Sequence, residues 1–366
     1  MLVNGDEGNV GGAQLQQILI AKELVERGHD VVFVENDAPE KTEQTVDGIR
    51  VVLKRDFGDS NVAVRTTVRA VETIQALRRV GPDVCYLRVL NFDLLPLTVY
   101  CSVTGTRLVY GFAHDSEVTD DPVTLGQWAN YETYKRLVWR ALSRADALIA
   151  QNERQRSAAV RRFGPDVSLV PNGYPIPDET PHADIRRADR PVVLWVATLR
   201  DWKRPGLVLD LADEIPDADF VIVGGRADEN PDLYDEIERE AGERDNVRFE
   251  GFVPYAEVDS YFAAADVFLN TSTDEGFPNT FLQAWAHRTP VASLNVDPSG
   301  ILADSEAGFC ADDEFDVLVE ILNSLITDAE WRADYSDAAF EYFRENHSID
   351  HIASKYEGIL TGKGRK

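Results

Sequence analysis

Cysteine is scarce in this chain, and long hydrophobic runs are missing. The 366 residues include only three cysteines, Cys85, Cys101 and Cys310, whose spacing fits neither a zinc site nor a disulfide framework. This usage favours a reducing compartment. No run of about eighteen apolar residues occurs, and the N-terminus lacks the charged and apolar regions of a signal peptide. We therefore expect a cytoplasmic protein without a membrane span.

Basic charge is also in short supply. The chain has 37 Lys and Arg residues against 64 Asp and Glu residues, a formal net charge of −27, and arginine far outnumbers lysine. Such an acidic surface repels itself in dilute buffer and is best tolerated where salt screens it. The composition resembles that of proteins from salt-accumulating, halophilic microbes. It argues against a nucleic-acid partner, because phosphate backbones attract basic surfaces.

The acidic charge is concentrated in the second half of the chain. Residues 1–178 contain 20 basic and 24 acidic residues, a net of −4, whereas residues 179–366 contain 17 and 40, a net of −23. In the first half, Arg136, Arg140 and Arg144 recur every four residues beside Trp139, along one face of an expected helix. This face would fit peripheral contact of the N-terminal domain with the inner face of the cell membrane. A solvated helix face has the same pattern, so both interpretations stay open.

Short apolar runs alternate with longer amphipathic segments along the chain. Segments with helical periodicity, such as 15–27 and 124–144, separate the runs, and a mainly helical tail follows from about Glu314. This order predicts an α/β protein with parallel sheets and helices on both faces. The runs typical of buried strands cover 30–36, 83–89, 107–112, 147–151, 167–171, 191–198, 219–225, 247–252, 267–272 and 290–295.

Two domains are expected, because a single core stops growing below this length. Residues 1–172 would form the N-terminal domain, and 173–190, rich in Pro, Asp and Arg, a linker. Residues 191–340 would form the C-terminal domain, and 341–366 a helical tail that packs back toward the N-terminal domain. Only Met1–Val3 stands where a full first strand should precede the first helix. Either the true start lies upstream of this sequence or the first strand is short.

The most informative segment is 274–286, DEGFPNTFLQAWA. An acid, Glu275, precedes a Gly-Phe-Pro loop and a helix that Asn279 or Thr280 can cap. The outward-facing N–H groups of such a helix start bind phosphate readily. Gln283 lies about 12 Å beyond Glu275 if the spacing is helical, so a diphosphate, a sugar and a ribose would fit along this span. An ordinary strand-to-helix loop with an incidental carboxylate also fits this segment alone.

Several segments follow one another in an order typical of one enzyme family. They are the Gly11-Gly12 turn before a helix ending ELVERGHDV, ADALIAQNERQ leading to VPNGYP, LRDWKRP, VIVGG, EGFVPYAEVDSYFAAADVFLNTS and EGFPNTFLQAW. Through them nearly the whole chain resembles the family-four retaining glycosyltransferases of the GT-B fold. The resemblance implies two doubly wound Rossmann-like domains facing a central cleft, the N-terminal one for the acceptor and the C-terminal one for the nucleotide sugar.

The resemblance also implies an activity and a set of site residues. A sugar would pass from a nucleotide-diphosphate donor to a glycan or lipid-linked acceptor with retained anomeric configuration, and with neither a metal nor another cofactor. Glu275 would contact the donor sugar and favour the positive charge that builds on it, Lys203 would neutralise the departing diphosphate, and His114 would lie near the sugar and the acceptor hydroxyl. The implied donor-binding residues are Gly12, Arg200, Gly276, Phe277, Asn279, Thr280, Gln283 and Val253.

Two positions depart from the family pattern. Gln283 stands where the family has a second acid, and an amide lacks the charge-assisted strength of a carboxylate toward ribose hydroxyls. Thr198 stands where the family has an arginine, so Arg200 or Arg204 would have to supply that charge. These departures keep open a catalytically weak or silent nucleotide-sugar binder or partner subunit. A GT-B nucleotide-sugar 2-epimerase or a glucan phosphorylase would need further cleft acids or a cofactor-binding lysine, and neither pattern is visible.

Overall fold

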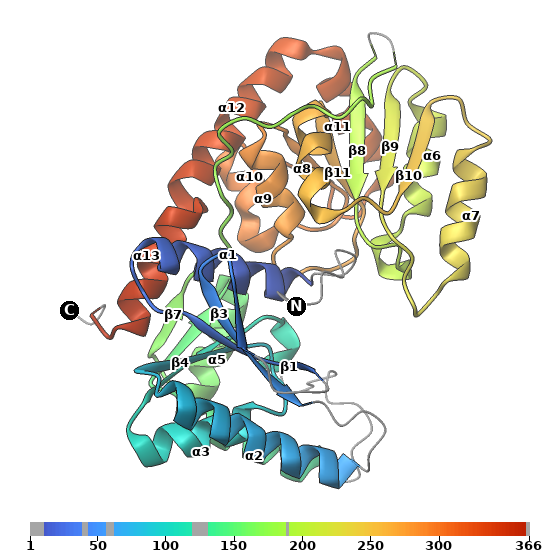
Figure 1. Ribbon diagram of the computed structural model, residues 1–366. Helices are drawn as coiled ribbons and strands as arrows, with labels where there is room; N and C mark the ends of the chain where they lie inside the picture. The colour runs from blue at the N-terminus through green and yellow to red at the C-terminus, as the bar shows by residue number, and fades with distance from the viewer. Residues whose placement is uncertain (1–10, 39–42, 56–61, 119–130, 188–189, 364–366) are drawn as a thin grey trace. The chain divides into compact units, whose positions relative to one another are not determined.

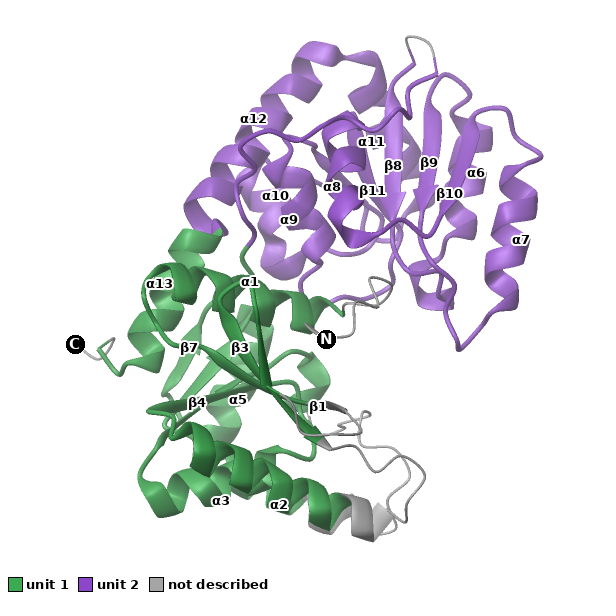
Figure 2. Ribbon diagram, viewed as in Figure 1, with its two compact units in different colours: residues 1–6, 11–173, 349–366 green, residues 7–10, 174–348 purple. Residues whose placement is uncertain are grey.

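The structure is a computed structural model that describes residues 11–38, 43–55, 62–118, 131–187 and 190–363 (Figure 1). The described residues fall into two compact units (Figure 2). Unit 1 contains Gly11–Gly173 together with the segment from Ile349 on, and unit 2 contains Tyr174–Ser348. The expected short first strand, Met1–Val3, lies outside the described residues.

The described part of unit 1 contains two sheets. In the first, β1 (Val32–Ala38) pairs in parallel with β3 (Ile49–Arg55), and β2 (Glu43–Val46) runs antiparallel to β3. The second sheet is fully parallel in the order β4 (Val84–Arg88), β5 (Arg107–Gly111), β6 (Ala147–Ala150) and β7 (Val167–Leu169). The helices are α1 (Gly12–Glu26), α2 (Val62–Val80), α3 (Leu94–Thr104), the short η1 (Asp115–Glu117), α4 (Tyr131–Leu142), α5 (Glu153–Phe163) and α13 (Ile349–Leu360).

The C-terminal helix α13 is an integral part of unit 1. Ile352 and Tyr356 are buried together with Ile20 of α1 and the strand residue Val109. At the end of α1, Arg27 donates to Asp350 Oδ1 at 2.5 Å. The chain therefore returns to unit 1 after Ser348, within the segment 341–366 that was expected to be a tail.

Unit 2 contains a six-stranded parallel sheet in the order β10-β9-β8-β11-β12-β13. Numbered from the first strand of the unit, this is the order 3-2-1-4-5-6 of a doubly wound fold, with a topological switch point between β8 and β11. The strands are β8 (Val192–Val196), β9 (Asp219–Val223), β10 (Val247–Gly251), β11 (Val267–Asn270), β12 (Val291–Ser293) and β13 (Gly308–Cys310).

Both faces of this sheet are covered, which explains why its strands read as continuous apolar runs. β9 is buried at every position, and so is β11. The expected alternation of parallel strands and helices is confirmed. The helices are η2 (Asp201–Lys203), α6 (Gly206–Glu214), α7 (Asp232–Ala241), α8 (Tyr255–Ala264), α9 (Asn279–Ala286), η3 (Pro298–Gly300), α10 (Ile301–Ser305), α11 (Phe315–Thr327) and α12 (Ala329–Asn346).

Within the expected linker 173–190, Gly173 belongs to unit 1, and the described residues from Tyr174 on belong to unit 2. Tyr174 and Ile185 are buried, and the Ala183 N–H donates to the Ser260 carbonyl on α8 at 2.9 Å. The Pro, Asp and Arg residues thus predicted an irregular segment correctly, but the buried Tyr174 and Ile185 fix it to unit 2. None of the helices in the described part of the chain has the length and hydropathy of a membrane span.

Candidate functional site

Two loops lie side by side at the switch point of the unit 2 sheet. One leaves β8 and runs to Arg204, and the other leaves β11 and runs to Pro278. Thr271 Oγ1 donates to the Lys203 carbonyl at 2.6 Å, and the Thr273 N–H donates to the Trp202 carbonyl at 2.9 Å. Neighbouring parallel strands have their carboxyl ends at the same edge of the sheet, and doubly wound folds bind ligands at this edge. The two loops, called the frame below, therefore lie where a ligand is expected.

Lys203 and Glu275, which the family resemblance assigns to the reaction, form an ion pair in this frame. Lys203 Nζ lies 2.5 Å from Glu275 Oε1, and each side chain is only 14% exposed. Ser272 Oγ donates to the same oxygen at 2.9 Å, and Asn270 Nδ2 at 3.4 Å. Among the described residues, the ion pair and both hydrogen bonds of this carboxylate reach Oε1. The second oxygen, Oε2, is therefore the one left for a ligand.

Ser272 and Asn270 are site residues that the sequence analysis missed. They hold Glu275 in place but do not belong to the motif that contains it. Their signal is their position directly at the end of the buried strand β11, where polar residues meet the ligand-binding edge. On the other loop, the Trp202 ring lies 4.1 Å from Lys203 Nζ and supports the ammonium by a cation–π contact.

The structure separates the two arginines that were considered as substitutes for Thr198. Arg204 donates to the carbonyls of Thr271 and Ser272 and to Asp313, so its guanidinium fastens the frame together. Among the described residues Arg200 makes a long ion pair of 3.5 Å with Glu229, and its side chain is 41% exposed. Arg200 is therefore the cation with more capacity to contact a ligand.

Helix α9 begins next to the ion pair, but its cap differs from the prediction. Pro278 is the N-cap residue, no side chain caps the helix, and Asn279 and Thr280 are its first two residues. The prediction that one of them caps the helix is wrong, because the Gly-Phe-Pro loop is extended up to Pro278. The first-turn N–H groups, which bind anions at helix starts, are thus those of Asn279 and Thr280, because the Phe281 N–H donates to the Pro278 carbonyl at 3.2 Å.

The loop residues Gly276 and Phe277 connect Glu275 to this helix start. The Phe277 ring is buried, with its centroid 5.0 Å from the His347 imidazole centroid. The buried side chain therefore anchors the loop on unit 2. Only the backbone of Gly276 and Phe277 remains to contact a donor.

Gln283 is buried on α9, and its amide is already engaged. Gln283 Nε2 donates to Asp259 Oδ1 on α8 at 3.0 Å and lies 3.4 Å from the Tyr174 hydroxyl. The expected contact with ribose hydroxyls can therefore use only the carbonyl oxygen of this amide. No local sequence pattern indicates the contact with Asp259, because it depends on the packing of α8 against α9.

Val253, another implied donor-binding residue, follows strand β10 of the same sheet. Val253 is half-buried after β10, beside the exposed Phe252. The VIVGG segment ends in a close backbone approach: a Cβ on Gly224 would lie 1.9 Å from the Ala197 carbonyl oxygen. Glycine at position 224 is therefore required for the ends of β8 and β9 to pack together.

Unit 1 carries the other two candidates, Gly12 and His114. Gly12 is the exposed first residue of α1, after Gly11, whose N–H donates to Gln14 Oε1 at 3.0 Å. His114 follows β5 and precedes η1. Partial burial and the nearby Arg88 guanidinium lower the pKa of His114, so its imidazole is neutral near neutral pH.

The loop that carries His114 is fixed by the segment after β6. Gln151 Nε2 donates to the carbonyls of Phe112 and Ala113 at 2.9 and 2.8 Å. Asp115, the residue after His114, accepts long hydrogen bonds from Asn152 and Gln155 at 3.4 Å. The ADALIAQNERQ segment therefore supports the histidine loop.

A buried acid lies three residues after His114, and the sequence analysis did not single it out. Glu117 accepts hydrogen bonds from the Tyr110 hydroxyl at 2.9 Å and from the Ala113 N–H at 3.3 Å. Burial nevertheless raises the pKa of Glu117 to about 7. Close by, the buried Arg88 donates to Asn172 Oδ1 at 2.7 Å. Glu117 and Arg88 are thus buried polar side chains close to the loop that carries His114.

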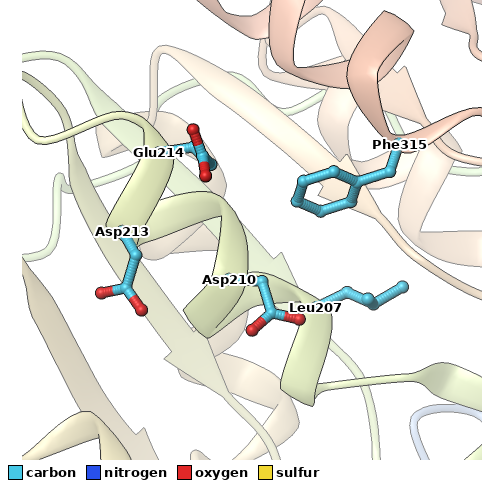
Figure 3. Close-up of a pocket in the computed structure, with 5 residues that line it drawn as sticks. All are labelled: Leu207, Asp210, Asp213, Glu214 and Phe315. Atoms are coloured by element: carbon cyan, nitrogen blue, oxygen red, sulfur yellow. The ribbon is translucent and has the colours of Figure 1, made fainter.

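An open pocket of about 410 Å³ lies elsewhere on unit 2, between α6 and the start of α11 (Figure 3). It is lined by Leu207, Asp210, Asp213, Glu214 and Phe315, none of which is a predicted site residue. Three of the lining residues are carboxylates, which disfavour a phosphate-bearing ligand. In the described ranges, no group of three or more His, Cys, Asp or Glu side chains could hold a metal ion.

Solved structures with the same architecture define the fold as GT-B. The chain superimposes on the Anabaena protein HepE, crystallised with UDP and glucose, with a TM-score of 0.76 over 97% of both chains at 19% identity. For sucrose-phosphate synthase from Thermosynechococcus elongatus the TM-score is 0.78, covering 96% of this chain and 94% of the other at 17% identity. The prediction of a two-domain Rossmann-like GT-B fold is confirmed.

Two family models match the two halves of the sequence. Residues 10–176 match Glycosyltransferase Family 4, and residues 178–342 match Glycosyl transferases group 1. Together with the fold, these matches support a family-4-type glycosyltransferase.

Curated relatives agree with this assignment over part of their length. D-inositol 3-phosphate glycosyltransferase from Xylanimonas cellulosilytica is 26% identical over 45% of this chain and 46% of its own. The lipopolysaccharide core biosynthesis glycosyltransferase LpsE from Rhizobium meliloti is 24% identical over 48% and 51%. The matched regions thus span about half the length of these relatives.

Proposed function

We propose that this protein is a retaining glycosyltransferase that moves a sugar from a nucleotide-diphosphate donor to a glycan or lipid-linked acceptor without a metal. The observation that carries the proposal is the Lys203–Glu275 ion pair at the switch point of the unit 2 sheet, beside the start of α9. HepE, which shares the fold, was crystallised with UDP and glucose, which supports a nucleotide-sugar donor. The names of the relatives, which act on an inositol phosphate and on lipopolysaccharide core, support an acceptor of this class.

The residues at the switch point have complementary tasks in this reaction. The first-turn N–H groups of α9 and the ammonium of Lys203 bind the diphosphate and stabilise the charge that it gains as it leaves. Glu275 Oε2 accepts from the sugar hydroxyls and favours the positive charge that develops on the sugar. Because Lys203 pairs with Glu275 in this structure, an arriving diphosphate would compete for the ammonium and turn it toward the leaving group.

A donor screen with the purified protein tests this function. UDP-, GDP- and ADP-sugars are offered at about molar salt, where an acidic surface is screened, and the anomeric configuration of the product is assigned by NMR. We expect turnover of one donor class with retention, its loss in Glu275→Ala, and its preservation in Asp274→Ala, which removes the neighbouring exposed carboxylate. Inversion, or full turnover in Glu275→Ala, contradicts the proposal.

The second candidate is a nucleotide-sugar binder without catalytic activity. Thr198 and the engaged amide of Gln283 favour it, because both replace a charged group of the family pattern. Tight nucleotide binding without turnover of any donor in the screen would identify this function.

Contact of unit 1 with an anionic membrane is a further part of the proposal. On α4, Arg136, Leu137 and Arg140 are exposed. Trp139, by contrast, packs against the unit 1 core with the Arg162 guanidinium 3.7 Å from its ring centroid, so Leu137 supplies the apolar contact instead. We expect cosedimentation with phosphatidylglycerol vesicles that falls as salt rises. No cosedimentation at any salt that keeps the protein folded excludes this contact.

A further inference from the structure

The amide of Gln283 is held by a group of polar side chains on α8, at the end of α9 and in the segment after β7. Asp259 Oδ1 accepts from Gln283 Nε2 at 3.0 Å. The Tyr174 hydroxyl lies 2.9 Å from both oxygens of Asp259 and accepts from the Tyr255 hydroxyl at 3.1 Å. His287, at the C-cap of α9, places Nε2 3.7 Å from Asp259 Oδ2.

Asp259 is ionised in this arrangement. Burial raises the pKa of its carboxyl, but the nearby His287 imidazole and hydrogen bonds from Gln283 and Tyr174 outweigh the burial, and the pKa lies below its usual value. Burial raises the pKa of Tyr174 well above the usual range, so its hydroxyl stays protonated and keeps donating. Asp259 therefore presents a carboxylate, which can only accept, toward position 283.

The chemistry of this contact fixes the orientation of the Gln283 amide. The nitrogen has to face Asp259, because the opposite flip would place the amide oxygen against a carboxylate oxygen. The carbonyl oxygen Oε1 then lies on the branch turned away from Asp259. It is the acceptor that remains for a ligand hydroxyl.

The same contact explains why an amide stands at position 283. A glutamate there would bring a second carboxylate to within about 3 Å of Asp259, and two carboxylates at that distance cannot both ionise without a large cost. We propose that Asp259 is a positioning residue for the donor: it aims the Gln283 carbonyl at a vicinal diol of the nucleotide, and it excludes a carboxylate at position 283. The positioning part rests on the proposed function, whereas the exclusion of a carboxylate does not.

Three variants test the pairing: Gln283→Glu, Asp259→Asn, and the double variant Asp259→Asn with Gln283→Glu. In Gln283→Glu the two carboxyls share a proton, so the folded-state pKa of the pair is raised. A raised carboxyl pKa means that stability is lost as pH rises, so the melting temperature relative to wild type should fall between about pH 5 and pH 8. In the double variant the new amide at position 259 donates to the new carboxylate at position 283, and this fall should disappear.

Several titratable groups face the pair and have to be kept constant. His287 at the end of α9, Tyr174 after β7 and Tyr255 on α8 are unchanged in all three variants, so their contributions cancel in the comparison. Glu257→Gln is the matched control, since it removes an exposed carboxylate from α8, the helix that carries Asp259. We expect its melting temperature to follow that of wild type at about pH 5 and at about pH 8.

Nucleotide binding, measured by calorimetry with UDP, GDP and ADP as probes, tests the positioning. At about pH 8, Gln283→Glu should bind the preferred nucleotide about tenfold more weakly than wild type, and the double variant should recover to within about threefold. Asp259→Asn alone should weaken binding by a smaller factor, because a neutral amide orients Gln283 less firmly.

The outcomes separate the inference from the function on which part of it rests. If Gln283→Glu shows no pH-dependent loss, or the double variant is as impaired as the single one, the pairing is overturned. If Gln283→Glu folds only at acid pH while the double variant folds at both pH values, the pairing is supported. If the stability results hold but wild type binds none of the nucleotides, the proposed function fails, and the positioning with it.

Discussion

Lys203 contributes to the site with both its backbone and its side chain. Its carbonyl accepts from Thr271, its ammonium pairs with Glu275, and Trp202 supports the ammonium from the side. The backbone contact stays intact when the side chain is removed, and Glu275 keeps its bonds from Ser272 and Asn270. Removing the Lys203 ammonium therefore tests the role of its charge while the loop structure stays intact.

Lys203→Ala should reduce kcat/KM for the donor by about 10²- to 10³-fold, the range for loss of one preorganised electrostatic contact. Its melting temperature should stay within a few degrees of wild type, about the shift that 1 kcal/mol causes. Lys355→Ala, which removes an exposed lysine from α13, is the control and should keep wild-type turnover. Unchanged kcat/KM in Lys203→Ala would show that the ion pair is merely structural.

Glu117 makes stability depend on pH. Its folded-state pKa of about 7 lies above the ordinary 4.5, because the carboxyl is buried. The native protein thus holds a proton that the unfolded chain releases, so stability falls as pH rises from about 4.5 to about 7. Glu117→Gln lacks this loss, and by about pH 8 it should be the more stable protein, by on the order of 2–3 kcal/mol.

Urea denaturation of wild type and Glu117→Gln across this pH range measures the effect. The difference between the two proteins isolates Glu117 from His114, whose lowered pKa is common to both. A difference that does not change with pH contradicts the assignment of a raised pKa to Glu117.

At the scale of elements, the junction of β8 and β9 depends on one glycine. A Cβ at position 224 meets a backbone oxygen that cannot move without shifting β8. Gly224→Ala should therefore cost about 3 kcal/mol or more in urea denaturation. The control is Gly206→Ala at the start of α6, where a Cβ has no neighbour within 4 Å among the described residues. That change should be neutral or stabilising by up to about 1 kcal/mol. Equal effects of the two substitutions contradict the close approach.

The elements that the sequence predicted well are those with clear periodicity. The apolar runs 191–198, 219–225 and 267–272 contain β8, β9 and β11, because buried parallel strands carry apolar residues on both faces. The β2–β3 hairpin was missed, although Asp47 and Gly48 lie between its strands with φ of 49° and 77°. An Asp-Gly pair that joins two strands is a strong local signal for such a turn.

The candidate site was predictable only where a motif lies within one element. Glu275 and the start of α9 are close in sequence, so spacing alone suggested a phosphate-binding helix start beside an acid, and the family resemblance added the donor role. The contact between Gln283 and Asp259 depends on the packing of α8 against α9, and the contact between Lys203 and Glu275 on the order of the strands. Neither can be read from local periodicity, because both are set by tertiary structure.

At the scale of the whole molecule, strand order explains how residues 72 positions apart come together. The chain builds β8, β9 and β10 outward in one direction and then returns to place β11 on the other side of β8. The loops after β8 and β11 are therefore neighbours, although two strands and their helices separate them in the sequence. At this switch point the connections run away from β8 and β11 in opposite directions, which leaves space for a ligand at the carboxyl ends of the two strands.

The net charge of −27 acts on the molecule as a whole. Surface ion pairs such as Arg226–Asp235 compensate only part of it, since acidic residues far outnumber basic ones. Raising KCl from about 0.1 to about 1 M shortens the screening length from about 10 to about 3 Å and so reduces the repulsion among the excess carboxylates. We expect the melting temperature to rise over this range.

The uneven distribution of charge predicts where this stabilisation acts. Because residues 179–366 carry a net of −23 and residues 1–178 only −4, amide hydrogen exchange should slow with salt mainly in peptides from 179–348. Sucrose at equal osmolality is the control, because it stabilises by exclusion from the surface and does not screen charge. Equal protection of both halves by KCl, or an equal effect of sucrose, would show that charge screening is not the cause.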